Sequence, residues 1–283
     1  MGETVEKCRC AVDVPLALPG EGQRLDRMQG HWLLARAGKR VLRPGGLDLT
    51  RRMLDALAIS EQDRVVELAP GLGITAGMVL RENPMQYCAV ERDPVAAKRL
   101  EAQLPRNRGQ VVQARAEDSG LPGGSATVVY GEAMLSMQTA EQKARIVAEA
   151  VRLLAPGGRY GIHELCLRPE GISEDKRREI TSAMSREIHV GVQPLCESEW
   201  ATLLERHGLK LVWTGEAAMD LLEPRRILRD EGLLGCLRVA FNVIRDPNLR
   251  RRMAAMRKIF SKYRDYLAAI SLVGVREQGA AQG

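Results

Sequence analysis

Aromatic residues are scarce in this sequence: phenylalanine, tyrosine and tryptophan together make up 4% of its 283 residues. So few rings leave little surface on which nucleic-acid bases could stack. Long apolar runs are also lacking, since no stretch approaches the roughly 20 residues needed to cross a bilayer. The N-terminus has no recognisable signal peptide. We therefore expect a cytoplasmic protein without a membrane span, and we do not expect nucleic acid to be its main partner.

Cysteine is too sparse for a disulfide framework, with six residues spread over the whole chain. Cys8 and Cys10 form a C-x-C pair near the terminus, but a soft-metal site would need further ligands close by. Cys166 and Cys196 flank residues 168–196, and unpaired cysteines usually act as small buried hydrophobes. We expect no resident metal site. Binding of a metalloid by these thiols stays open as an alternative.

The net charge of +6 is concentrated in one segment, Arg245–Arg264. On a helix, its apolar residues fall on one side and its arginines on the other. The pattern predicts an amphipathic helix with a solvated basic face, and a phosphate-binding track is the alternative. The residues on the predicted apolar side are Leu249, Met253, Met256, Ile259, Phe260 and Tyr263.

From about residue 62 the sequence alternates short β-rich runs with helical patterns, which indicates an α/β fold with a mostly parallel sheet. Helices are expected at 73–81, 94–104, 140–154 and 199–207. A Pro-Gly-Gly turn at 156–158 should end the third of these. Strands are expected at 64–69, 86–91, 110–114, 126–131, 159–165, 209–214 and 268–276.

Three segments fall outside this alternation. Residues 1–60 contain a tail followed by two expected helices, and residues 61–283 form the main domain. That domain is interrupted at about 168–196 and 219–265. Insertions beyond the carboxyl ends of strands are where open α/β folds build substrate pockets. We therefore expect the three segments to form a helical cap.

A carboxylate precedes the first glycine turn, in Glu67-Leu-Ala-Pro-Gly71-Leu-Gly73. The glycine spacing also fits dinucleotide-binding folds. However, Glu67 would repel a pyrophosphate by about 1 to 4 kcal/mol at ~4 Å. S-adenosylmethionine carries an ammonium and a sulfonium and no phosphate, so its charge suits Glu67. Glu91 ends the second expected strand, where a carboxylate can bind both ribose hydroxyls.

With these motifs in order, the sequence resembles the class I S-adenosylmethionine-dependent methyltransferases, and in organisation it is similar to the small-molecule group that includes the quinone-biosynthesis enzymes. The resemblance implies a Rossmann-like seven-stranded sheet, mostly parallel, with an antiparallel last strand. It also implies cofactor contacts from the glycine loop, the ends of the second and fourth strands and an adenine-side loop. Those residues are Glu67, Ala69, Pro70, Gly71, Gly73, Glu91, Arg92, Ala116, Glu117 and Gly131.

Two positions depart from the family pattern. Ala69 stands where the first loop glycine is usual, and alanine costs little there if its φ is negative. Arg115 stands where an aspartate is common in the adenine-side loop. Glu117, rather than Asp118, is therefore the residue we expect at the adenine amino group.

The methyl acceptor is expected to be a small molecule, with the methylated atom (O, N, S or C) and the oligomeric state left open. Gly131-Glu132-Ala-Met134 lacks the Asn/Asp-Pro-Pro-aromatic element of nucleic-acid N6-adenine methyltransferases. The catalytic candidates are His163 and Glu132 at strand ends, with His189 and then His31 as rivals. The alternatives are an RNA methyltransferase that uses the basic 245–264 helix, an arsenite-type methyltransferase, a nucleotide-dependent oxidoreductase and a cofactor-binding regulator.

Overall fold

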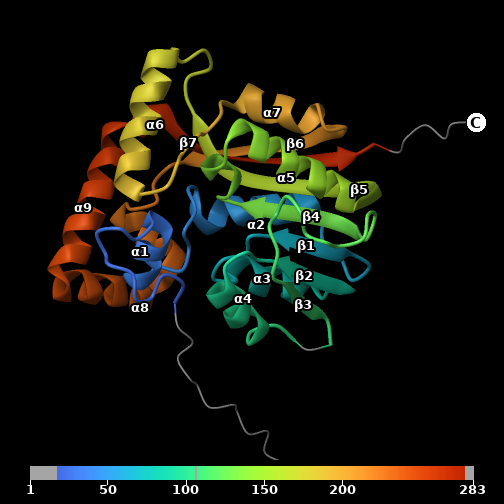
Figure 1. Cartoon of the computed structure of the whole chain (residues 1–283), viewed down its shortest axis with the longest axis horizontal. Coiled ribbons are helices and arrows are strands. Elements are labelled where there is room, and N and C mark those ends of the chain that lie inside the picture. The colour runs from blue at the N-terminus through green and yellow to red at the C-terminus, as the bar shows by residue number, and fades with distance from the viewer. Residues whose placement is uncertain (1–17, 106, 278–283) are drawn as a thin grey trace, which may run out of the picture.

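The computed structural model describes residues 18–105 and 107–277. Seven strands form one sheet in the order β3-β2-β1-β4-β5-β7-β6 (Figure 1). Strand β7 runs antiparallel to both of its neighbours, and the other pairings are parallel. This confirms the expected fold class. The strands are β1 (Arg64–Leu68), β2 (Gln86–Val90), β3 (Gly109–Val112), β4 (Ala126–Glu132), β5 (Leu154–Leu167), β6 (Leu209–Ala218) and β7 (Leu267–Arg276).

The described helices connect these strands or extend beyond them. They are α1 (Gly30–Arg36), α2 (Gly46–Leu57), α3 (Ile74–Val79), α4 (Pro94–Glu101), α5 (Ala140–Leu153), α6 (Glu174–Ile188), α7 (Glu197–Glu205), α8 (Pro224–Arg245) and α9 (Pro247–Lys262). Short 3₁₀ turns cover Leu80–Glu82, Leu135–Met137 and Arg264–Tyr266. None of the helices in the described part of the chain is both long and apolar enough to cross a bilayer.

Helix starts follow the local chemistry of the chain. The Asp93 carboxylate accepts hydrogen bonds from the backbone N–H groups of Val95 and Ala96, at 2.8 and 3.0 Å, and Pro94 stands in the first turn of α4. Helix α5 begins with a capping box, in which Thr139 and Gln142 bond each other's backbone N–H groups. These caps fix where the chain turns back from the carboxyl edge of the sheet.

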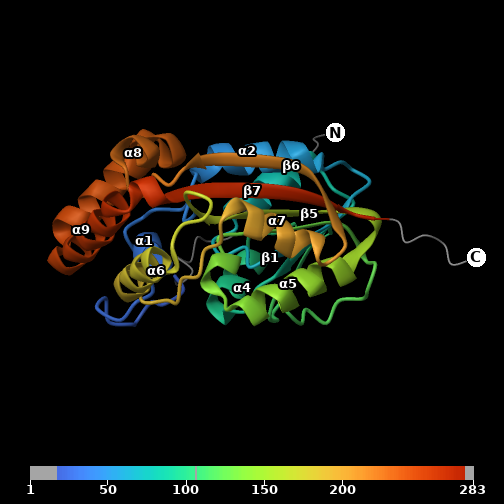
Figure 2. The same cartoon turned by 90° about the horizontal axis from the view of Figure 1, so that it is seen from above.

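Helices cover both faces of the sheet. Helices α2, α3 and α4 pack on one face, with Met53, Val79 and Leu100 in the core. Helices α5 and α7 pack on the other, with Ile146 and Trp200 in the core (Figure 2). The central strands are therefore buried on both sides, as their near-continuous apolar sequence requires.

A separate group of helices, the cap, lies at one end of the sheet: α1, α6, α8 and α9 (Figures 1 and 2). Its own apolar core includes Leu33, Met184, Met256 and Phe260. The predicted apolar side of the basic segment packs into this core. Its role as a structural amphipathic helix therefore follows from the packing of α9.

The structure corrects three expectations about the elements. Helix α2 packs against β5, β6 and β7, so of the two N-terminal helices α1 alone joins the cap. Strand β5 starts at Leu154, with an irregularity in its pairing to β4, because the Pro-Gly-Gly segment continues the strand after α5 ends. The helix expected at 73–81 is α-helical at Ile74–Val79 and becomes a 3₁₀ turn at Leu80.

Candidate active site

A cavity of about 980 Å³ lies between the carboxyl edge of the parallel strands and the cap. The ends of β1, β2 and β4 and the chain after β3 form its floor, through Glu67, Glu91, Glu132 and Ala114. The cap closes it from the other side. Cap residues on the wall are Gln29, His31, Trp32, Met184, Ile188, His189, Met219, Leu221 and Phe260.

Glu67 lines the cavity and is otherwise buried. The Tyr130 hydroxyl donates to its Oε2 at 2.6 Å, and the Tyr87 hydroxyl donates to the same oxygen. Neither tyrosine bonds the second carboxylate oxygen, Oε1. Burial raises the pKa of Glu67 to about 7, although both tyrosine hydroxyls act in the opposite direction. The carboxyl group therefore titrates near neutral pH, and an incoming cation would favour its ionised form.

The glycine loop follows directly and corrects one expectation. Ala69 has φ 55°, so its backbone is left-handed and the negative φ that would make alanine inexpensive there is not adopted. Gly71 has φ 58°, and a Cβ built there would meet no atom within 4 Å. Gly73 has φ 74°, and its Cβ would lie 2.6 Å from Leu100 Cδ2. The space that a Cβ at Gly71 would occupy is therefore open to the cavity, and we call this space the open cradle. Gly73 permits close helix packing and does not line the cavity.

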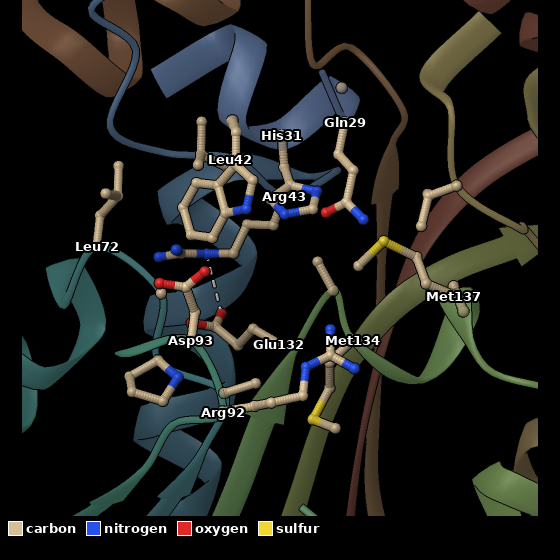
Figure 3. A pocket seen from close by; sticks show the side chains of 18 of the residues that line it. Gln29, His31, Leu42, Arg43, Leu72, Arg92, Asp93, Glu132, Met134 and Met137 are labelled. Carbon is tan, nitrogen blue, oxygen red and sulfur yellow. Dashed lines mark ion pairs between the residues drawn. The ribbon is translucent and has the colours of Figure 1, made fainter. Parts of the chain in front are cut away.

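Glu91 holds this loop in place from the end of β2. Its Oε2 accepts from the Gly71 N–H at 3.1 Å and its Oε1 from the Asp93 N–H at 2.9 Å. Burial raises the pKa of Glu91. Its neighbours Arg92 and Asp93 also line the cavity, and Figure 3 shows both between the strand ends and the cap.

The adenine-side loop is brought to the same cavity. Ala116 and Glu117 line it, together with Pro70 and Ala69 from the glycine loop, whereas Asp118 does not. The Arg115 side chain donates to Glu117 Oε1, with Nε at 2.6 Å. The arginine that departs from the family pattern is therefore used to hold Glu117.

Glu132 is the most heavily bonded carboxylate of the site. Its Oε1 lies 3.0 Å from Arg43 Nε, 2.9 Å from His163 Nδ1 and 2.6 Å from Thr50 Oγ1, while Thr75 donates to Oε2. Burial alone would raise its pKa, but Arg43 and His163 outweigh burial and lower the pKa to about 2. Glu132 is therefore a permanent carboxylate whose bonds are already made, and the structure does not support its predicted role as a base.

His163 does not reach the cavity, and this corrects the first catalytic prediction. It is fully buried, with Nε2 2.7 Å from the Pro44 carbonyl oxygen and Nδ1 against Glu132. Both ring nitrogens are engaged by groups inside the protein, so neither is placed to meet a methyl acceptor. Gly131, another predicted cofactor contact, also does not line the cavity, and a Cβ there would lie 3.0 Å from Met134 Sδ.

The two other histidines considered in the sequence do line the cavity. His189 ends α6 in a left-handed conformation, with φ 54°. His31 points from α1 into the cavity near Arg43 (Figure 3). Burial lowers the pKa of His31 to about 4, and Arg92 adds to this while Asp93 opposes it. The imidazole of His31 is therefore neutral at neutral pH.

Arg43 is a site residue that the sequence reasoning missed. Its side chain extends into the cavity, and a dashed line in Figure 3 marks its ion pair with Glu132. Its Nε also donates to Thr50 Oγ1 at 2.7 Å. Its Nη2 is buried without a hydrogen-bond partner in the described structure. The Pro44-Gly45-Gly46 turn that follows Arg43 is the sequence feature that could have drawn attention to this loop.

Cys166 and Cys196 do not form a thiol or metal-binding site. Cys166 and Cys196 do not line the cavity, and burial raises the pKa of both thiols. The described residues contain no group of three or more potential metal ligands. Cys8 and Cys10 lie outside the described residues.

Comparison with known proteins gives consistent matches. A family model described as "Methyltransferase domain" matches residues 66–162. An uncharacterised protein of Haemophilus influenzae is 31% identical over 236 residues, or 82% of this chain and 92% of the relative. A ribosomal RNA small subunit methyltransferase A of Maridesulfovibrio salexigens is 33% identical over 67 residues, 24% of this chain and 26% of that protein.

Among solved structures, the fold is similar to a phosphoethanolamine N-methyltransferase 2 of Haemonchus contortus in complex with phosphomonomethylethanolamine and S-adenosylhomocysteine. The TM-score is 0.67 at 14% identity, covering 92% of this chain and 59% of the other.

The chain belongs to the class I S-adenosylmethionine-dependent methyltransferases. It is an enzyme that transfers a methyl group from S-adenosylmethionine. Membership of this family excludes the oxidoreductase alternative. The charge of Glu67, the open cradle at Gly71 and the buried Arg43 Nη2 all fit the methionine part of that cofactor.

Proposed function

We propose that this enzyme methylates a small-molecule acceptor with an apolar body, enclosed beneath the cap. The observation that carries the proposal is the cap side of the cavity, which is lined mainly by aliphatic, thioether and aromatic side chains. Such a lining with a few polar groups is typical of small-ligand pockets. The apolar residues are Trp32, Leu42, Met134, Met137, Leu165, Met184, Ile188, Val190, Val192, Met219, Leu221 and Phe260.

The floor of the cavity is proposed to hold the cofactor. Glu67 Oε1 would accept from the methionine ammonium, and Arg43 Nη2 would donate to the methionine carboxylate. Glu91 would bind the ribose hydroxyls, and Glu117 the adenine amino group. All four side chains line the same cavity. The tyrosines bond only Oε2 of Glu67, Arg115 bonds only Oε1 of Glu117, and Arg43 Nη2 has no partner in the described structure. Both oxygens of Glu91 already accept backbone N–H groups and would accept the ribose hydroxyls as additional bonds.

When bound, S-adenosylmethionine supplies a methyl group already activated by its sulfonium. The protein must then hold the acceptor in line with that methyl group and exclude water. A base is needed only for an acceptor that arrives protonated. His31 is proposed for that role because its neutral imidazole lines the cavity, and His189 is the alternative. His163 would position Glu132, and through it Arg43.

The alternatives have weaker support. An RNA methyltransferase would use the basic side of α9, and the short match to a ribosomal RNA enzyme favours that reading. However, a single-stranded substrate would need aromatic platforms, which this chain has few of. An arsenite-type enzyme would need thiols at the cavity, and Cys166 and Cys196 are elsewhere. The quinone-biosynthesis resemblance and the cytoplasmic location stay predictions.

The test is to follow a labelled methyl group. The enzyme and methyl-labelled S-adenosylmethionine are incubated with a cell extract, which is then separated into RNA, protein and low-molecular-weight fractions. We expect the label in the low-molecular-weight fraction, extractable into organic solvent and insensitive to ribonuclease. Enzyme-dependent label that ribonuclease releases from RNA would overturn the proposed acceptor class.

A further inference from the structure

Helix α8 presents an apolar face to solvent. The chain departs from helical geometry at Gly232 (φ 71°, ψ 177°), and the second half of α8 turns its large side chains outward. Gly235 and Val239 on the opposite side are buried. The α8 face, as we call it, consists of Leu233, Leu234, Leu237, Phe241 and Ile244, each between 58% and 79% exposed.

These residues form one continuous stripe. The spacings from Leu233 to Leu237, Phe241 and Ile244 are four, four and three residues, which is the repeat of a single helix side. The stripe is about 16 Å long at 1.5 Å per residue. Single exposed apolar residues are ordinary, but a contiguous patch of this kind marks an interaction surface.

The charged side chains of α8 that are exposed to solvent are all arginines. Arg225, Arg229, Arg238 and Arg245 are exposed on α8, whereas its acids, Asp230 and Glu231, are buried. Both acids are used inside the protein, where they bind the backbone of residues 40, 41 and 47. The sequence of α9 contains no acid, and its arginines at 250 and 251 are exposed. Arg229 and Arg257 are paired with Asp48 and Glu223, each at 3.0 Å.

We propose that the α8 face binds the surface of a bilayer that contains anionic phospholipid. A helix with an aliphatic side and arginines beside it lies in the interfacial plane, with the apolar side chains about 5–10 Å into the headgroup region. The arginines at 238 and 245 then meet phosphate and other anionic headgroup oxygens. Figure 2 shows α8 and α9 outermost at the cap end of the molecule, where a flat surface can reach them.

Other occupants fit the same observations less well. A second copy of the chain would bring the same arginines together across a two-fold contact, with no acid from α8 or α9 to offset them. RNA would be attracted by the arginines, but leucine and isoleucine offer no stacking surface for bases. The bilayer accounts for the apolar stripe and for the cationic charge together.

Docking would also place the cap against the headgroup region of the bilayer. Met219 and Leu221, just before α8, and Phe260 of α9 line the cavity. An acceptor with an apolar body, which is the proposed function, would be concentrated in that membrane. The docking itself does not depend on that function.

The test is flotation of the full chain with vesicles of phosphatidylcholine alone and of phosphatidylcholine with phosphatidylglycerol. We expect binding to the anionic vesicles and little to the zwitterionic ones. The double variant Leu237→Gln/Phe241→Gln should weaken binding at least about tenfold, because these two side chains contribute to binding by burying apolar area in the bilayer. The variant Arg238→Gln/Arg245→Gln should weaken it by roughly fivefold for each arginine.

The matched control is Met85→Gln, which removes an apolar side chain that is 54% exposed just before β2, away from the cap. It should bind vesicles like the wild type. Titration with S-adenosylhomocysteine verifies that each variant is folded. Equal binding by all variants, or no binding to anionic vesicles, would overturn the proposal. So would a stable dimer or RNA complex that the Leu237→Gln/Phe241→Gln variant abolishes while vesicles do not bind.

Discussion

Arg43 and Glu132 form a buried ion pair, with 3.0 Å between Nε and Oε1 and both side chains more than nine-tenths buried. The carboxylate is satisfied by Thr50, Thr75 and His163 as well, but the guanidinium keeps Nη2 unpartnered at the cavity. An acceptor on a bound ligand would complete the hydrogen bonding of this atom. We therefore expect this pair to hold the guanidinium in position to bind an anionic group.

The first prediction concerns that anion. Arg43→Gln should weaken binding of S-adenosylhomocysteine by about 10- to 100-fold, the value of one buried charge-assisted bond. Its decarboxylated analogue, which lacks the carboxylate, should bind both proteins equally. The measurement is calorimetric titration with each ligand.

A control separates this role from folding. Removing one partner of a buried pair is strongly destabilising, so the double variant Arg43→Gln/Glu132→Gln, which removes both charges, is measured alongside. It should discriminate between the two ligands as poorly as the single variant does. Equal losses of affinity for both ligands would instead indicate that Arg43 maintains the shape of the cavity and does not bind the carboxylate.

The second prediction follows from the raised pKa of Glu67. The unliganded carboxyl group holds its proton up to a pKa of about 7, and a cationic ligand favours the ionised form. Affinity for S-adenosylhomocysteine should therefore rise with pH, by at most tenfold per pH unit, up to about pH 7. Above that pH the affinity should stay constant. Titrations in buffers of different ionisation enthalpy should detect proton release at pH 6.

The variant Glu67→Gln provides the comparison and also a test of stability. It should bind more weakly and lose this pH dependence. Because the pKa in the folded state is raised, the wild type gains stability from this group below pH 4.5 and loses it as pH rises through 7. Unliganded wild type should thus lose stability relative to Glu67→Gln over that interval. An unchanged pH dependence of binding in the variant would contradict the role of Glu67.

The third prediction separates two glycines of the loop. Alanine at either position costs about 1–2 kcal/mol in the left-handed conformation. Gly73→Ala should lose more stability, because its Cβ would lie 2.6 Å from Leu100 Cδ2. Gly71→Ala should lose at least about tenfold in cofactor affinity instead, because its Cβ enters the open cradle. Thermal unfolding and calorimetry together decide this, and the reverse assignment would be evidence against the cradle.

The sheet and the glycine loop could be predicted because their determinants are local. Buried apolar runs, turn residues and a carboxylate at a fixed spacing place β1, β2 and the loop between them, whatever the rest of the chain does. Arg43 could not be placed in the same way. Its position depends on a contact with Glu132, at the end of a strand far along the chain, and nothing in the local sequence indicates that pairing.

His163 shows more clearly why the sequence does not predict which side chains line the cavity. Its strand and its place beside Glu132 follow from the sheet register. However, β5 continues to Leu167, so His163 lies within the strand and not at its end. Successive side chains of a strand also point to opposite faces, so a predicted strand does not say which residue meets a ligand. The imidazole turns toward Pro44 and Thr50 and lies behind the wall. His31 could not be ranked above it, because its proximity to the cavity depends on how the cap packs.

The fourth prediction links the cap to the cofactor site. Glu231 of α8 is fully buried in its side chain and accepts from the backbone N–H groups of Arg40 and Val41, at 2.7 and 2.8 Å, with Lys39 Nζ 3.8 Å away. These residues lead directly to Arg43. Glu231→Gln should cost about 3–5 kcal/mol, since it leaves the buried lysine with less compensation. It should also weaken cofactor binding by displacing the loop that carries Arg43.

Glu223→Gln is the matched control, because this glutamate precedes the same helix and pairs with Arg257 at the surface, at 3.0 Å. An exposed pair is worth about 0–1 kcal/mol, so its loss should change neither the unfolding temperature nor the affinity appreciably. If Glu231→Gln lowered the stability of the protein but left its affinity for the cofactor unchanged, Glu231 would stabilise the cap without affecting the position of Arg43. A fall in both would mean that the packing of α8 sets the position of Arg43.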